Sequence, residues 1–246
     1  MSYEFHAGAM IIVTLTAVLA IFLVCKTSNR LSVLIGLISW IALSAYFIIE
    51  AIVIRATAAP YSFLNQPMSD LGVTACGTDT YLLASYTICS PYHWLMNWTF
   101  FLTGLFILIG AVLLSPLWPK VRSAKIANIL IGVFGVSYAI SGIIPADIDF
   151  YWHTLTALPG MVVQIPAMIL ISIAIHKKMP RIFWWTIICT IVTTAALLSL
   201  FLQPVFTGLP GGLLQRILYA SVYIWLTGTA IGLWSRRIHK AQQKGS

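Results

Sequence analysis

Seven long apolar runs, separated by shorter polar segments, make up most of the chain. A helix needs about 20 mainly apolar residues to cross a hydrocarbon core about 30 Å thick. The runs are close to this length, and they lack the strict alternation over about 10 residues that barrel strands show. We therefore predict an all-α integral membrane protein, a bundle of seven transmembrane helices in a single membrane domain over residues 1–246. The predicted spans are 7–25, 31–54, 94–117, 126–145, 156–175, 182–203 and 214–234.

Composition strengthens this prediction. Hydrophobic residues make up 60% of the chain and charged residues only 8%, whereas about a quarter of a soluble domain is charged. Glu4 and His6 precede the first run, which lacks both a basic leader and a clear small-residue cleavage site. We interpret that run as the first membrane helix rather than as a signal peptide.

The distribution of Lys and Arg predicts the orientation. Twelve of the fourteen basic residues fall in segments that seven spans place on one side, which the positive-inside rule makes cytoplasmic. The N-terminus is then outside, the C-terminus is cytoplasmic, and we expect a multi-pass protein of the cell membrane, in a bacterium the cytoplasmic membrane. The net charge of +8 is thereby explained by topology, and no nucleic-acid-binding motif accompanies it. The acidic residues all lie on the outer side: Glu4, Glu50, Asp70, Asp79, Asp147 and Asp149.

The only long connection, residues 55–93, is predicted to form an ordered outer cap. Its many aromatic and aliphatic residues are unlike those of a solvated linker. Cys76 and Cys89 both lie in it, on the oxidising side, so a disulfide is favoured over two reduced thiols.

A second outer segment, "PADIDFYWHT", carries Asp147, Asp149 and His153. If the chain is helical there, Asp149 and His153 lie one turn apart on one face. Carboxylate and imidazole side chains can form an acid/base pair or share a divalent metal ion. The three residues are weak metal candidates, and a polar cluster without metal or a simply solvated loop are the alternatives.

Two outer segments repeat the pattern T-x-L-P-G-x3-Q. They are "TALPGMVVQ", which ends at Gln164, and "TGLPGGLLQ", which ends at Gln215. Proline at the first turn with a preceding threonine is typical of a helix start. The pattern predicts two helix N-termini. They are either two helix starts with similar sequences and no shared role, or two helix ends that together bind an anionic or polar headgroup.

The most polar stretch of the first half is "YSFLNQPMSDLG", residues 61–72, with Asn65, Ser69 and Asp70. Gly72 suggests a tight turn with positive φ that directs Asp70 back into the bundle. Arg216 lies at the outer end of the last span, where an ionised side chain needs a partner. We expect that partner to be Asp70, Asp147, Asp149 or Glu50, and we favour Asp70.

This stretch, His153 and "GLLQR" at Gly212 to Arg216 resemble the domain-of-unknown-function 998 family of multispanning prokaryotic membrane proteins. That family is itself distantly similar to the Frag1/DRAM/Sfk1 group. The resemblance covers roughly residues 35–230 and implies an α-helical membrane bundle, with Ser69, Asp70, Leu71, Gly72, His153 and Arg216 as the residues to examine. It implies no activity, and the cysteine pair and the D-x-D run are not attributable to it.

From these residues we expect an outward-facing polar pocket in which Asp70, His153 and Arg216 converge. The pocket would bind a membrane lipid or another amphiphile, and as an enzyme it would hydrolyse or transfer part of it. His153 would then be the general acid or base, oriented by Asp70 or Asp149, with Ser69 as the only candidate nucleophile. The expected ligand-binding residues are Arg216, Gln215, Gln164, Ser69 and Asn65.

Two other functions stay open at this point. A transporter or binding protein would use the same pocket as its outer vestibule. A structural or immunity-type membrane protein would use the Asp70 and Arg216 pair only to hold the cap. We predict no cofactor, with a divalent metal as the alternative, and the sequence leaves the oligomeric state open.

Overall fold

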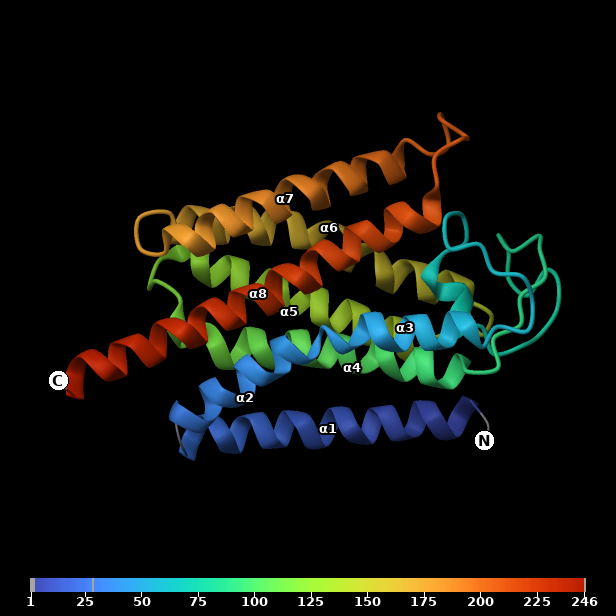
Figure 1. Ribbon diagram of the computed structural model, residues 1–246. Coiled ribbons are helices and arrows are strands. Elements are labelled where there is room, and N and C mark those ends of the chain that lie inside the picture. The colour runs from blue at the N-terminus through green and yellow to red at the C-terminus, as the bar shows by residue number, and fades with distance from the viewer. Residues whose placement is uncertain (1–2, 28, 246) are drawn as a thin grey trace.

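The computed structural model describes residues 3–27 and 29–245, and it is a bundle of long helices (Figure 1). Seven segments of this described part are long and apolar enough to span a membrane, which confirms the predicted fold class. The α-helices are α1 (Tyr3–Thr27), α2 (Asn29–Ala42), α3 (Ala45–Arg55), α4 (His93–Leu114), α5 (Arg122–Ile143), α6 (Phe150–Ile175), α7 (Pro180–Phe201) and α8 (Gly211–Gly245). Two short 3-10 helices, η1 (Met68–Gly72) and η2 (Ser115–Leu117), lie next to α4.

The second predicted span consists of two helices, α2 and α3. Between them, Ser44 and Tyr46 donate their backbone N–H groups three residues back, to Ile41 and Leu43. This local tightening interrupts the α-helical pattern without proline or glycine. The hydroxyl of Ser44 also donates to the Ile41 carbonyl.

Small residues allow α4 and α5 to pack closely. A Cβ added to Gly104 would lie 2.3 Å from the backbone nitrogen of Ala139, and one added to Gly135 would lie 2.7 Å from the Gly104 carbonyl. Backbones at this separation gain the van der Waals contact that drives helix association in lipid. Toward the cap, the core beside these helices is aromatic, with Tyr46, Phe100, Phe134, Tyr138, Tyr219 and Tyr223 in mutual ring contact.

The segment between α3 and α4, residues 56–92, is the cap. A disulfide joins Cys76 and Cys89 with an S–S distance of 2.00 Å, so the disulfide prediction is confirmed. Next to it, Gly77 and Ile88 exchange backbone hydrogen bonds. The cap has a small core of its own, formed by Val73, Tyr81, Ala84 and Ile88 with Ala146.

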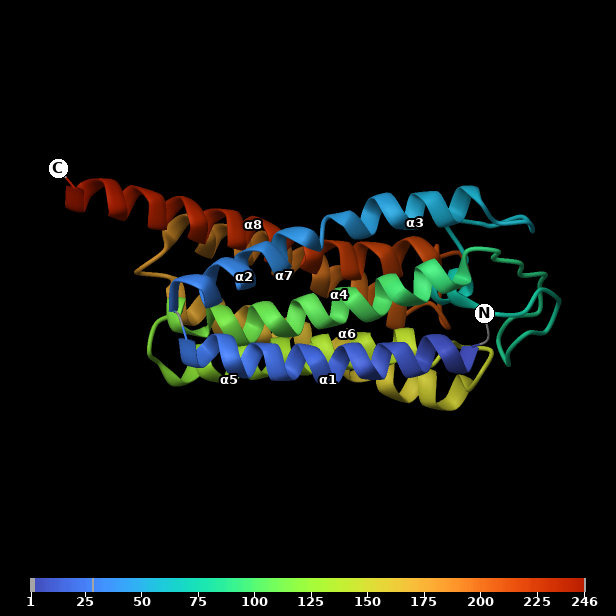
Figure 2. The ribbon, with the colours of Figure 1, turned by 90° about the horizontal axis from the view of Figure 1, so that it is seen from below.

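The two ends of the bundle differ in charge. The N-terminus and the cap lie at one end, which we call the cap end (Figure 1). The C-terminus lies at the other end, together with the helix ends and connections that carry most of the basic residues, as the view turned by 90° also shows (Figure 2). Which end faces the cytoplasm stays a prediction.

Candidate functional site

The S-D-L-G element forms η1, and Gly72 brings it against α4. A Cβ on Gly72 would lie 2.2 Å from Oδ1 of Asn97, whose Nδ2 donates to the Gly72 carbonyl at 2.8 Å. The expectation that Gly72 has a positive φ is wrong, because no glycine among the described residues has one. The glycine is needed for close approach instead.

Asp70 is buried in the cap and accepts hydrogen bonds from two phenols. The hydroxyl of Tyr81 donates to Oδ1 at 2.5 Å and that of Tyr86 to Oδ2 at 2.7 Å. Burial raises the pKa of Asp70 above its ordinary value, and the bonds from Tyr81 and Tyr86 offset part of that rise. Burial and the Asp70 charge also raise the pKa of Tyr81 and Tyr86, so both phenols remain donors.

Arg216 pairs with Glu50 rather than with Asp70. Its Nε lies 2.9 Å from Oε1 of Glu50, and both side chains are buried. The favoured Asp70 pair is therefore wrong, and Glu50 is the partner among the four expected acids. The guanidinium also donates to the Tyr61 hydroxyl and to the carbonyls of Phe63, Gln66 and Gly212.

These contacts leave Arg216 engaged by protein groups on every nitrogen. Its Cζ also lies 4.4 Å from the ring centre of Phe63, a cation–π geometry. Arg216 thus ties α8 to α3 and to the cap, and nothing in this geometry presents it to a ligand.

A small pocket, which we call the central pocket, lies between η1 and helices α4, α5, α6 and α8. Its volume is about 40 Å³, and Ser69, His153 and Gln215 line it. Asp70 and Arg216 do not line it, so the expected convergence of Asp70, His153 and Arg216 is wrong. The reason is local geometry: neighbours in a helix point about 100° to 120° apart. The other lining residues are Met68, Phe100, Tyr138, Ser141, Ala157 and Tyr219.

His153 is oriented by a backbone carbonyl. Its Nδ1 lies 2.7 Å from the carbonyl oxygen of Ile144, which can only accept, so Nδ1 carries the proton. In the neutral ring Nε2 then has a free lone pair. The predicted orienting role of Asp70 or Asp149 is therefore wrong.

The two other acids of the D-x-D run have structural contacts. Asp149 caps α6 by accepting from the backbone N–H of Trp152 at 3.0 Å. Oδ2 of Asp147 accepts from the N–H and the hydroxyl of Thr74, which joins the cap to the α5–α6 connection. In the described part of the chain no three potential ligands are grouped closely enough to hold a metal ion.

The predicted helix start before Gln164 is wrong, because α6 already begins at Phe150 and Pro159 lies inside it. The backbone bond that Pro159 disturbs is replaced by α5: Gly160 N–H donates to the Ser137 hydroxyl at 2.9 Å, and that hydroxyl donates to the Thr156 carbonyl. Gln164 is therefore a buried mid-helix residue.

The second repeat does open a helix, but its N-terminus is already occupied. The N–H of Leu213 donates to the Leu64 carbonyl of the cap at 2.9 Å. Oε1 of Gln215 accepts from the Met68 N–H at 2.8 Å, which fastens η1 to α8. Asn65 is exposed and bonds the hydroxyl of Ser62, outside the central pocket.

Sequence reasoning missed Tyr138, which lines the central pocket and whose buried hydroxyl lies next to those of Tyr46 and Tyr223. It also missed Tyr81 and Tyr86 as the partners of Asp70. A tyrosine within an apolar run or a cap gives no signal that separates a packing residue from a polar one.

Comparison with known proteins supports the family resemblance. A family model described as "Protein of unknown function (DUF998)" matches residues 40–232. No curated protein and no solved structure matches the chain. The match covers most of the chain, including η1, the cap and α8 up to residue 232, and the chain therefore belongs to the DUF998 family.

Proposed function

We propose that the protein binds a membrane amphiphile at the cap end, with one polar group of that molecule in the central pocket. The observation that carries this proposal is a set of incompletely bonded polar groups around one cavity. Tyr138 lines this cavity, and its hydroxyl is buried beside those of Tyr46 and Tyr223. In the described chain the Ser69 hydroxyl, Nε2 of His153 and Nε2 of Gln215 make no hydrogen bond, and all line the same pocket.

A ligand that fills the pocket cuts these groups off from water, so it must bond them or leave them unpaired. A buried hydroxyl or amide without a partner costs about 1–3 kcal/mol, and most such groups in proteins are bonded. The pocket offers donors and an acceptor together, so a hydroxyl or an ester group fits it. Its volume of about 40 Å³ matches one such group rather than a whole headgroup.

The position of the pocket favours an amphiphile over a water-soluble ligand. Its walls come from four membrane-spanning helices and from η1 of the cap. A ligand with one polar end in the pocket would lie with the rest of its length against the apolar side chains of these helices. The basic connections at the opposite end support an outer-leaflet location under the positive-inside rule.

The test compares two buried hydroxyl side chains. Tyr138 lines the pocket, whereas Thr229 is buried in α8 and does not line it. Phosphatidylethanolamine, phosphatidylglycerol and diacylglycerol are added separately to the purified chain, and retained lipid is measured by native mass spectrometry. Tyr138→Phe should weaken retention of the bound lipid about 5–10-fold, as expected for one lost hydrogen bond. Thr229→Val should leave it unchanged, and equal effects of both changes would refute the proposal.

A second candidate, amphiphile hydrolysis, is favoured by the protonation of His153. Because Nδ1 is held by the Ile144 carbonyl, Nε2 can take a proton from Ser69 or from water within the pocket. Turnover of any of the three lipids that disappears in His153→Ala and persists in His176→Ala would establish it. His176 is exposed near the other end of α6.

The two alternatives have less support. A proton or ion path needs polar groups between the pocket and the end of the bundle opposite the cap. All six acidic residues of the chain lie in the half next to the cap instead. A purely structural role accounts for the contacts of Arg216 and Asp70. It does not account for the unbonded groups around the central pocket.

A further inference from the structure

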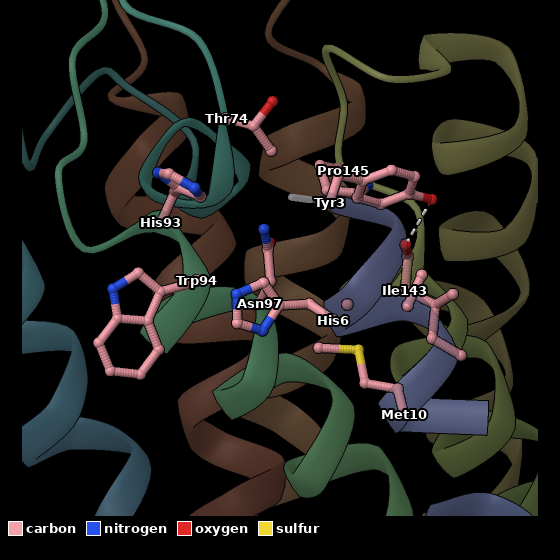
Figure 3. Close-up of a pocket in the computed structure, with 11 residues that line it drawn as sticks. Tyr3, His6, Met10, Thr74, His93, Trp94, Asn97, Ile143 and Pro145 are labelled. Carbon is pink, nitrogen blue, oxygen red and sulfur yellow. Dashed lines mark hydrogen bonds between the residues drawn. The ribbon is translucent and has the colours of Figure 1, made fainter. Parts of the chain in front are cut away.

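A second and larger pocket, which we call the α1 pocket, lies between α1 and the rest of the bundle at the cap end (Figure 3). Its volume is about 280 Å³, and none of its lining residues lines the central pocket. Helix α1 supplies Tyr3, His6, Ala7 and Met10, and α4 supplies His93, Trp94 and Asn97.

The two histidines of this pocket have opposite hydrogen-bonding roles. Nδ1 of His6 lies 3.1 Å from Nε1 of Trp98, which can only donate, so in the neutral ring Nε2 of His6 carries the proton. Nδ1 of His93 lies 2.9 Å from the Ser90 carbonyl, which can only accept, so Nε2 of His93 has the lone pair. One imidazole offers a donor and the other an acceptor.

This pair suits a ligand hydroxyl, which accepts one hydrogen bond and donates another. No Lys, Arg, Asp or Glu is among the described residues that line the pocket, so a charged headgroup would lose its hydration without gaining a counterion from them. The ring of Trp94 stacks on that of His6 at 6.4 Å with an interplanar angle of 12° and forms one flat wall. The volume is at the lower limit of ligand pockets, which fits a headgroup rather than a whole lipid.

The position of α1 gives such a ligand access from the bilayer. Met10 is the only buried side chain among residues 3–24, and most of this helix faces outward. The family model begins at residue 40, so α1 completes this pocket from outside the matched region. We propose that the α1 pocket binds the headgroup of an uncharged, hydroxyl-bearing amphiphile that enters from the membrane beside α1. This proposal is independent of the function proposed for the central pocket.

The experiment uses the full chain in phosphatidylcholine nanodiscs with a monoacylglycerol that carries a photoreactive diazirine next to its glycerol group. Labelled peptides are identified by mass spectrometry. We expect labelling within residues 3–10 and 93–97, and competition by unlabelled monoacylglycerol. His6→Ala and His93→Ala should each reduce labelling about 5–10-fold, as expected for one lost hydrogen bond.

A matched pair on α1 separates occupancy from folding. Ala7 lines the pocket, whereas a Cβ on the adjacent Gly8 would meet nothing within 4 Å. Ala7→Phe should fill the cavity and abolish most labelling, and Gly8→Phe should leave it unchanged. Equal labelling of the two variants, or labelling confined to other segments, would overturn the site. Stronger labelling by lysophosphatidic acid with the same reactive group would overturn the uncharged class.

Discussion

Asp70 shows how a buried carboxyl group can be held by hydrogen bonds rather than by a direct ion pair. Its two carboxylate oxygens accept from Tyr81 and Tyr86, and the disulfide between Cys76 and Cys89 closes the loop that carries both phenols. Charge-assisted hydrogen bonds of this kind are about twice as strong as neutral ones. Asp70 is therefore the polar centre of the cap, next to but outside the central pocket.

Removing one of these donors should destabilise the fold. Tyr81→Phe should lower the free energy of unfolding at neutral pH by about 1–3 kcal/mol, because the buried Asp70 loses one of its two phenol hydrogen bonds. Tyr151→Phe is the control, since Tyr151 is exposed on α6, and it should stay within about 0.5 kcal/mol. Denaturant unfolding in detergent measures both, and an equal effect would exclude a special role for this contact.

The raised pKa of Asp70 predicts a pH dependence. Because ionisation is less favourable in the folded cap than in the unfolded chain, the contribution of Asp70 is complete below its unfolded pKa of about 4. It is lost as the pH rises through the higher folded-state pKa. Asp70→Asn should remove this pH-dependent contribution to stability. Plots of the free energy of unfolding against pH for the native chain and the variant should therefore approach each other toward acid pH or cross there. Parallel curves from pH 3 to pH 7 would contradict the assignment.

At the scale of elements, Arg216 and Glu50 join three parts that are distant in sequence: α3, α8 and the cap. A further contact between cap and bundle is made by Gln215, which fastens η1. Together they position Ser69 over the central pocket. The Ser137 hydroxyl acts similarly within the bundle, because it completes the hydrogen bonds of α6 beside Pro159.

Breaking the buried ion pair should be strongly destabilising. Arg216→Met leaves Glu50 buried without a counterion, and we expect a loss of about 3–5 kcal/mol. Arg55→Met on the exposed last turn of α3 is the matched control and should change stability little. Thermal unfolding in detergent separates them. If Glu50→Leu combined with Arg216→Met is no more stable than Arg216→Met alone, the pair is not the cause.

At the scale of the whole molecule, seven membrane-spanning segments place the cap and the basic connections at opposite ends. Both proposed binding pockets lie at the cap end. Their exposure to the outer leaflet rests on the charge asymmetry of the sequence, and this can be measured directly.

Orientation can be tested with single cysteines at two exposed positions. Asn65→Cys lies in the cap and Lys177→Cys in the connection between α6 and α7. In intact cells a membrane-impermeant maleimide should modify Asn65→Cys above the level of the unsubstituted chain. It should modify Lys177→Cys only after the membrane is permeabilised. The reverse pattern would place the cap in the cytoplasm.

Local composition and length are enough to predict the seven spans, the ordered cap, the cysteine pair and the segregation of charge. The sequence also singled out Ser69, His153 and Gln215, which do line one pocket. The folded chain was needed to find that Arg216 pairs with Glu50, that Asp70 faces two tyrosines, and that Pro159 lies within a helix. Neighbouring residues of a helix face different directions. Which of them meets a partner therefore depends on how the helices pack. That packing includes close approaches such as the one at Gly72, and no local pattern encodes it.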